Sequence, residues 1–339
     1  MHNDTRVLYN EYLARQAQLN GVSSASQGYS VTPTVQQILE DKIQESSEFL
    51  GKINMVPVRE KSGAKLGLGI NGPGAGRTNT EVRDRQPRDL HTLDSTGYSC
   101  EQTEFDTYIR YATLDAWAKF KDFQTRVRNQ IIQRQALDRM VIGFHGVSVS
   151  PDSDLLANPM LQDVNKGWLQ HLRTDAPSRV MQEVKPGSGA VKIGAGVGIA
   201  DGYKNIDALV FDAIRLMDPW YHNNPRVVCM LGRTLLDDKY FPLINTQQTP
   251  SETLAADIVV SQKRVGGLQA VALPYFPDNT LLITTYDNLS IYWQESARRR
   301  RTEENAKRSR IENYDSSNDA YVVENYGLAA MVENIQFVG

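Results

Sequence analysis

The chain contains little cysteine and no long apolar run. Cys100 and Cys229 are its only cysteines in 339 residues, too few for a disulfide framework or for a metal site built on cysteine. No apolar stretch approaches the ~20 residues that a membrane-spanning helix needs. Residues 1–15 lack the apolar core of a secretory signal. We therefore expect a protein that is assembled in a reducing cytoplasm and has no membrane partner.

Strong charge of one sign is also absent. The net charge is −3 at pH 7, whereas a protein whose main task is to coat nucleic acid carries a marked positive excess. With 40% hydrophobic and 23% charged residues, the composition is that of a folded protein. The length is enough for a sizeable core and for two or three lobes.

Signatures of catalysis are missing or incomplete. Gly67-Leu-Gly69-Ile-Asn-Gly72 spells the G-x-G-x-x-G pattern of a dinucleotide site, but Pro73-Gly74 follows where that site needs the N-terminus of a helix. The five histidines are scattered without metal-binding spacing, and no nucleophile elbow or P-loop occurs. We expect no catalytic, cofactor-binding or metal-binding residue. A nucleotide-binding enzyme that uses the Gly67 loop is the less favoured alternative.

The most extended pattern is a long amphipathic helix. Between Thr113 and Phe144 apolar residues recur at steps of three and four, and the strand pattern Gln102–Tyr111 leads into it. A helix of this length measures roughly 45–50 Å, more than the ~30 Å of a small domain. Other layers or neighbouring subunits must therefore cover its apolar stripe. Charged residues such as Arg139 fill the other positions. The stripe comprises Leu114, Trp117, Phe120, Phe123, Val127, Ile131, Leu137, Val141 and Phe144.

Two helix patterns joined by a polar linker make up the N-terminal region. The first helix ends at Asn20-Gly21, and the second begins at Thr32-Pro33 and runs to about Leu50. Residues 22–30 between them are small and polar, too poor in apolar groups to pack. The first helix is therefore either a detachable piece or a plain mobile terminus.

Glycine dominates the segment that follows. Residues 53–58 contain a proline and are typical of an edge strand. Residues 61–95 then hold six glycines and few side chains that could anchor a core. Such a stretch of ~35 residues is unusual, because loops longer than ~15 residues are uncommon in compact domains. We expect a two-stranded arm that leaves the body and packs against something else, before residues 98–111 alternate as a strand.

The C-terminal half alternates helix and strand patterns. Residues 158–172 read as a helix, and residues 185–202 as a loop or hairpin. Residues 205–285 resemble an α/β lobe, with helices beginning at Asn205, Thr234 and Ser251 and strands at 227–231, 270–273 and 281–285. Further strands follow to Phe337. The basic run Arg298–Arg301 is interleaved with glutamates, which favours salt bridges within or between subunits, or a solvated face, over nucleic-acid contact.

Several separate blocks along nearly the whole chain resemble one family, the major capsid proteins of tailed phages with the Hong Kong 97-type fold, and most nearly the Peduovirus type. The order of the predicted elements is also the same: N-terminal arm, glycine-rich loop, long helix, separate lobe and returning strands. The blocks are Gln44-Glu-Ser-Ser-Glu-Phe-Leu50, Ile109-Arg-Tyr111, Thr113-Leu-Asp115, Asn158-Pro-Met-Leu-Gln-Asp163, Gly167-Trp-Leu169, Asp238-Lys-Tyr-Phe-Pro242, Leu254-Ala-Ala-Asp257, Ser261-Gln-Lys-Arg264, Pro274-Tyr-Phe-Pro277, Asn288-Leu-Ser-Ile-Tyr292, Glu312-Asn-Tyr314 and Tyr321-Val-Val-Glu324.

This resemblance implies an α+β fold and a division of the chain. The implied parts are an N-terminal propiece or scaffold-like segment at 1–29, an N-arm at 30–52 and an extended loop at 61–95. A peripheral domain takes 53–60, 96–204 and 286–339, with a spine helix at about 113–145, and an axial domain takes 205–285. The implied function is that of a shell subunit, without catalysis, which forms pentamers and hexamers around double-stranded phage DNA in the virion.

The resemblance also implies partners and two candidate sites. A phage protease associated with an internal scaffolding protein would cut near Tyr29 and Ser30, and a portal protein would join the shell. Packaged DNA would touch the inner face without sequence specificity, and assembly would take place in the cytoplasm of a bacterial host. An encapsulin-like compartment shell is the alternative within the same structural class. The extended loop would lie on a neighbouring subunit through Gly67, Gly69, Gly72, Arg77, Arg83 and Arg85.

Overall fold

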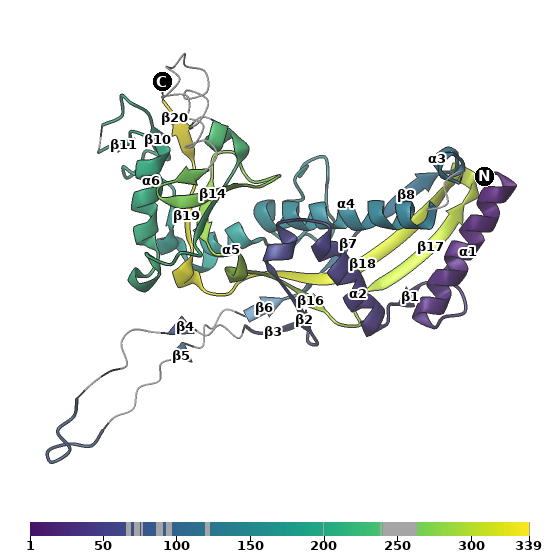
Figure 1. Cartoon of the computed structure of the whole chain (residues 1–339), viewed down its shortest axis with the longest axis horizontal. Coiled ribbons are helices and arrows are strands. Elements are labelled where there is room, and N and C mark those ends of the chain that lie inside the picture. The colour runs from purple at the N-terminus through teal and green to yellow at the C-terminus, as the bar shows by residue number, and fades with distance from the viewer. Residues whose placement is uncertain are drawn as a thin grey trace, which may run out of the picture.

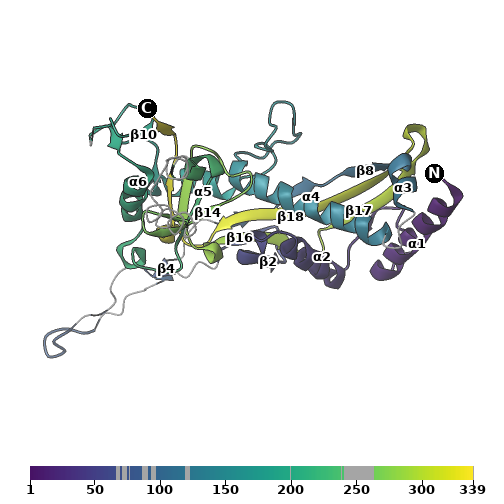
Figure 2. The same ribbon diagram turned by 45° about the horizontal axis from the view of Figure 1, so that its top comes forward.

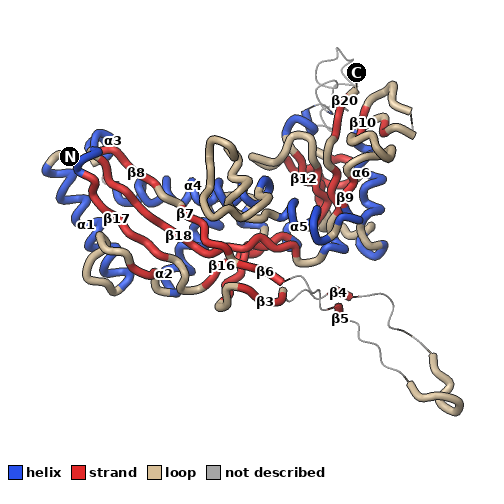
Figure 3. Tube along the Cα trace, turned by 180° about the vertical axis from the view of Figure 1, so that it is seen from behind, coloured by secondary structure: helices blue, strands red, loops and turns tan. Residues whose placement is uncertain are grey.

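The computed structural model describes residues 1–65, 69–70, 75, 77–85, 91–92, 97–118, 123–198, 200–237, 239 and 263–338. These residues form an elongated α+β molecule with a sheet and a long helix at one end and a second sheet at the other (Figure 1). The described part of residues 61–95 extends away from both (Figure 3).

Strand β18 (Arg310–Val323) is the axis of the first sheet, which has seven strands. Its side chains alternate between the two faces of the sheet. Two strands pair end to end with one edge of β18, namely β17 (Arg299–Asn305) and β16 (Leu289–Gln294). Two others pair with the opposite edge, namely β8 (Thr107–Arg110) and β7 (Glu101–Glu104). The outermost strands are β1 (Tyr29–Ser30) and β2 (Asn54–Val58), so the expected edge position of the proline strand is confirmed.

A long helix, α4 (Phe123–His145), lies along this sheet (Figure 2). The sequence predicted one helix over 113–145; the structure describes α3 (Tyr111–Trp117) and α4, while residues 119–122 between them lie outside the described part. The C-terminal half of α4 is buried on most sides. It packs with α5 (Trp168–Asp175) and with β16 and β18 in one core, which includes Met140, Phe144, Trp168, Ile291 and Tyr321.

The second sheet has six strands, in the order β13-β14-β12-β15-β19-β9. Helix α6 (Ile206–Ala213) packs against it, and the Asn205 side chain caps that helix as predicted by accepting a hydrogen bond from the Ala208 N–H. Strands β9 and β19 come from outside residues 205–285, so that segment does not build its sheet alone; its division from the remainder as a domain stays a prediction. The strands are β13 (Arg264–Val265), β14 (Leu268–Ala272), β12 (Val228–Leu231), β15 (Leu281–Thr284), β19 (Ala330–Val332) and β9 (Val180–Met181).

Two sequence predictions in this half are wrong. The helix expected at 158–172 begins only at Trp168, because Leu161 has a φ of 56° and Gly167 is extended, which no continuous helix permits. Residues 185–202 were expected to be a loop or a hairpin; most of the described ones are loop, but the hairpin alternative is wrong. Strand β10 (Val191–Ile193) pairs in parallel with β11 (Gly202–Tyr203) and with β20 (Ile335–Phe337). Of the two further predicted helices, residues 233–237 are helical, whereas residues 251–258 lie outside the described part.

The N-terminal helices are α1 (Asn3–Asn20) and α2 (Pro33–Glu45). Gly21 ends α1 with a φ of 64°, and Pro33 starts α2, both as predicted. Helix α2 stops five residues before the predicted end at Leu50, where a separate 3-10 turn follows. The 3-10 turns are Leu50–Lys52, Pro177–Arg179, Ile214–Leu216, Pro219–Tyr221, Tyr286–Asn288, Ala306–Arg308 and Tyr326–Leu328.

The arm is two-stranded where the structure describes it, as predicted. Strand β3 (Ser62–Ala64) pairs with β6 (Gly97–Ser99), and β4 (Gly69–Ile70) pairs with β5 (His91–Thr92), both antiparallel. The described tip, residues 77–85, lies far from both sheets (Figure 3). Its side chains are almost all exposed to solvent.

Candidate assembly surfaces

Helix α1 is docked on the end of the first sheet. Tyr9 and Tyr12 are buried in an apolar cluster with Leu114 of α3, Ile131 of α4 and Ile311 of β18. The Arg6 guanidinium pairs with the Glu304 carboxylate, and the Tyr111 hydroxyl donates a hydrogen bond to the same carboxylate. These two hydrogen bonds hold the pKa of Glu304 below its ordinary value. In this subunit α1 is therefore a docked helix with a side that faces solvent.

The linker after α1 corrects a prediction. Residues 22–30 were expected to be too polar to pack, yet Ala25 is 1% exposed and its carbonyl accepts a hydrogen bond from the Thr302 N–H at 3.0 Å. Tyr29 and Ser30, the candidate processing residues, form β1 and pair antiparallel with Arg300 and Arg299 of β17. Backbone pairing with a sheet edge, rather than apolar content, orders this segment.

A buried network of charges joins α2, α4 and the sheet. The Arg139 guanidinium pairs with Glu40 and, at 3.0 Å, with Asp319. The Arg298 guanidinium lies 2.7 Å from Glu40 and 2.8 Å from Asp315. All five side chains are at most 1% exposed. Because a buried charge without a partner costs several kcal/mol, these groups specify how the three elements fit together.

The surroundings shift the pKa values of the three buried carboxylates in opposite directions. Burial alone would raise the pKa of Glu40, but the Arg139 and Arg298 guanidiniums outweigh it and hold this pKa below its ordinary value. Arg298 and Arg300 act in the same way on buried Asp315, whose pKa is also lowered. For Asp319 burial dominates, and the nearby Glu40 carboxylate adds to it, so its pKa is raised despite the contact with Arg139.

The arm tip is a compact turn that presents charge. The Asn79 carbonyl accepts hydrogen bonds from the N–H groups of Val82 and Arg83, and the Asn79 side chain accepts one from Glu81. Arg77, Arg83 and Arg85 are exposed, and Val82 is 80% exposed between them. Of the candidate glycines, Gly69 lies in β4, whereas Gly67 and Gly72 lie outside the described residues.

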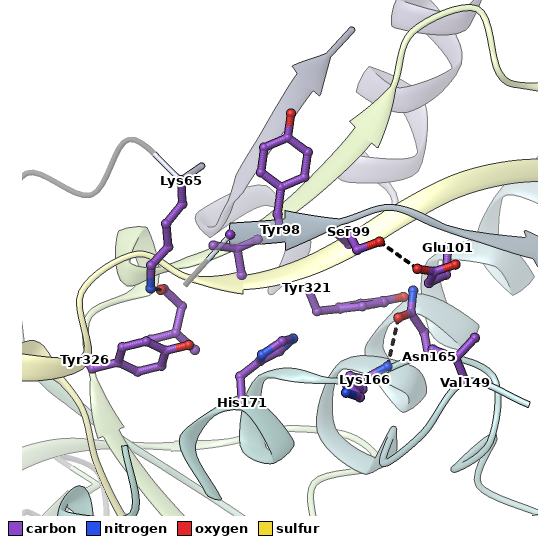
Figure 4. Close-up of a pocket in the computed structure, with 14 residues that line it drawn as sticks. Lys65, Tyr98, Ser99, Glu101, Val149, Asn165, Lys166, His171, Tyr321 and Tyr326 are labelled. Carbon is purple, nitrogen blue, oxygen red and sulfur yellow. Dashed lines mark hydrogen bonds between the residues drawn. The ribbon is translucent and has the colours of Figure 1, made fainter. Parts of the chain in front are cut away.

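At the root of the arm is a cavity of about 250 Å³ with a lining of mixed polarity. Figure 4 shows the residues that surround it, which come from β6, β7, β18, α5, the 3-10 turn at Tyr326–Leu328 and the loops after β3, after α4 and before α5. The Lys65 ammonium donates a hydrogen bond to the Val323 carbonyl at 3.0 Å and lies 3.9 Å from the centre of the Tyr326 ring. His171 and Lys166 line the opposite side (Figure 4).

The described residues contain no group of three or more His, Cys, Asp or Glu side chains placed to hold a metal ion. No helix among them is both long and apolar enough to span a membrane. Cys100 and Cys229 are buried free thiols, and burial raises the pKa of each to about 12.

Comparison with known proteins places the chain in a family. Residues 8–335 match the family described as phage major capsid protein, P2 family. The chain belongs to this family. It is 48% identical to the capsid protein of Escherichia phage P2, over 99% of this chain and 96% of the relative. It is 41% identical to the major capsid protein of Serratia phage KSP20, over 99% of this chain and 98% of the relative.

A solved structure supports the same assignment. The chain is 45% identical to a chain of the satellite phage P4 procapsid that includes the size determination (Sid) protein, with a TM-score of 0.82 and coverage of 100% and 99% of the two chains. The resemblance drawn from the sequence blocks is thereby confirmed, together with the α+β Hong Kong 97-type fold. This capsid protein is a structural subunit of a tailed-phage shell, and the family membership decides against both the nucleotide-binding enzyme and the encapsulin-like compartment.

Sequence reasoning missed the buried charges of this capsid protein. Arg139 was assigned to the charged side of the long helix, but its side chain is 0% exposed, because α2 and β18 cover that side as well. Arg298 was expected in salt bridges within or between subunits or on a solvated face; its salt bridges lie within one subunit, and what the sequence did not show is that they are buried. One signal was available: Asp315, Ser317 and Asp319 alternate along a strand, which places three polar side chains on one face.

Proposed function

We propose that this capsid protein assembles as hexamers and pentamers into an icosahedral head that encloses double-stranded DNA. The observation that carries the proposal is family membership over nearly the whole chain, and the 45% identical relative comes from a procapsid. DNA would touch the inner face without sequence specificity, in line with the net charge of −3. Electron microscopy of particles made by the co-expressed late genes tests this; open sheets or a single small ring as the only products would contradict it.

We infer that the arm locks each subunit onto a neighbour. Its tip has exposed arginines, an exposed valine and no core of its own, so contacts for it must come from another chain. Each such contact can be modest, because closure of a symmetric lattice repeats it many times. Deletion of residues 67–85 should leave a soluble subunit with a normal melting temperature that forms no closed shells. Normal heads from the deletion variant would refute this role for the arm.

We also propose proteolytic removal of residues 1–29 near the bond between Tyr29 and Ser30. Two observations support a cut there. Tyr29 and Ser30 lie at the sheet edge in extended conformation, the conformation in which proteases bind their substrates, and α1 is held by a local apolar cluster around Tyr9 and Tyr12 and by the Arg6–Glu304 pair. Intact-mass measurement of mature particles should find a chain that starts near Ser30. A full N-terminus in infectious heads would contradict the proposal.

A shell that is built empty and then filled with DNA needs further proteins. The proposed partners are an internal scaffolding protein with its maturation protease and a portal protein at one vertex. Assembly is proposed to take place in the cytoplasm of the bacterial host. Proteomic analysis of purified immature and mature particles tests the set. The scaffold and protease should be abundant only in immature particles, and the portal should be present in both.

A further inference from the structure

One edge of β18 is left open at its C-terminal end. Strand β7 pairs with it up to Glu101 and Asp319. Strand β6, which precedes β7 in the chain, pairs with β3 instead. On this edge the Phe105 N–H donates to the Asp315 carbonyl at 2.7 Å. Because main-chain groups in an antiparallel strand alternate between its two edges, those of Tyr321 and Val323 point to the same edge as those of Asp315.

The opposite edge supports this assignment. There the Glu324 N–H donates to the Asn288 carbonyl at 3.0 Å, so residues of even number in this part of β18 bond to β16. Two main-chain carbonyls on this edge accept hydrogen bonds from side chains, one where the β7 pairing ends and one beyond it. Asn165 donates to the Asp319 carbonyl at 2.8 Å, and Lys65 donates to the Val323 carbonyl. The main-chain N–H and C=O of Tyr321 point to this edge, where no strand of the described residues pairs with them.

The cavity lies beside this edge, between β18, β6 and the loop before α5. Gly97, Tyr98 and Ser99 line it together with residues 320–323 of β18 (Figure 4). The Tyr321 side chain is 1% exposed, and its hydroxyl has no hydrogen-bond partner in the described part of the chain. Buried polar groups are nearly always paired, so an unpaired hydroxyl beside main-chain groups that no strand pairs with indicates that something else completes this site. The volume of about 250 Å³ corresponds to what roughly eight water molecules occupy in the liquid. A single bridging water needs much less room.

We propose that an extended segment of a second copy of this chain adds as a short strand to the open edge of β18 and fills the cavity. A second copy is the occupant because this protein belongs to a family whose subunits build a shell, so copies surround each subunit. Backbone pairing with Tyr321 supplies the affinity, as in other strand additions to a sheet edge. Lys166 beside the cavity favours a carboxylate on the incoming segment, since the nearby acids already have partners: Glu101 pairs with Lys61, and Asp175 with His171.

Two valines on one loop allow a matched test. Val149 lines the cavity, whereas Val147 does not, and both are 44% exposed. Val149→Trp should fill the mouth of the cavity and reduce the yield of closed shells at least tenfold, with the melting temperature of the free subunit unchanged. Val147→Trp should assemble like the wild type. Normal assembly of Val149→Trp would overturn the proposal.

Hydrogen exchange gives a second test that does not need a variant. The Tyr321 amide should exchange at least tenfold more slowly in shells than in free subunits, while the Glu324 amide, already bonded to Asn288, should change little. Equal rates for Tyr321 in both states would mean that only water fills the cavity. Protection that appears only when a different viral protein is present, and is absent from shells of this chain alone, would also overturn the assignment to a second copy.

Discussion

The Arg298 Nη1 atom lies 2.7 Å from the Glu40 Oε1 atom, and both side chains are buried. Glu40 belongs to α2, and Arg298 directly precedes β17, more than 250 residues later in the chain. Their buried contact therefore fixes α2 to the first sheet. Buried charge pairs of this kind contribute less to the free energy of unfolding than to selecting one arrangement of the helix on the sheet.

The first prediction concerns loss of one partner in this network. Glu40→Ala leaves the guanidiniums of Arg139 and Arg298 short of a buried carboxylate, so we expect a loss of about 3–5 kcal/mol in the free energy of unfolding. Denaturant unfolding followed by tryptophan fluorescence measures it. Glu45→Ala is the matched control on the same helix, because its pair with Lys42 is exposed and should be worth less than ~1 kcal/mol. Equal small losses for both variants would show that the network is not rigidly buried.

The second prediction concerns pH. The pKa values of Glu40 and Asp315 are lowered in the folded state, so their stabilising effect is complete above about pH 4.5 and is lost as pH falls through the folded values. Asp319 opposes this trend, because its pKa is raised and the fold favours its protonated form. The stability gap between wild type and Glu40→Gln should therefore shrink from pH 6 to pH 3. A gap that is constant or grows on acidification would contradict the assignment.

A third prediction tests the close packing of α4 on α5. A Cβ atom added at Gly143 would lie 2.1 Å from Cζ3 of Trp168, whose side chain is fully buried. Gly143→Ala should therefore destabilise the subunit by about 1–3 kcal/mol through overpacking, measured as a lower unfolding midpoint. Gly196→Ala is the control, because its Cβ would meet open space, and a change within about 0.5 kcal/mol is expected there.

The fourth prediction separates folding from assembly at the arm. Replacing Arg77, Arg83 and Arg85 together by alanine should leave the melting temperature of the subunit unchanged, because all three side chains are exposed. The yield of closed shells should fall, and raising the salt concentration should lower wild-type yield in the same way, since exposed charges are screened by salt. Sedimentation of assembled particles measures both. Arg308→Ala, also exposed but on the body, should assemble normally.

The amino-acid sequence determined the local structure of this protein well. The end of α1, the start of α2, the cap at Asn205, the proline strand at the edge and the two-stranded arm follow from turn, cap and periodicity rules that act over a few residues. The family could also be recognised from the sequence alone, because many short blocks recur in the same order. The prediction of a helix at 158–172 failed because the positive φ of Leu161 and the extended backbone of Gly167 interrupt the apolar pattern.

Only the tertiary structure decided which polar residues are interior. Arg139 and Arg298 look like surface residues in the sequence, and so do Glu40 and Asp319, since burial of each requires partners from segments up to about 280 residues apart. No local pattern encodes such a meeting, because it depends on how α2, α4 and β18 stack. The open edge at Tyr321 has the same origin: a strand pattern gives the residues that alternate, but the point at which a neighbouring strand departs is a property of the assembled sheet.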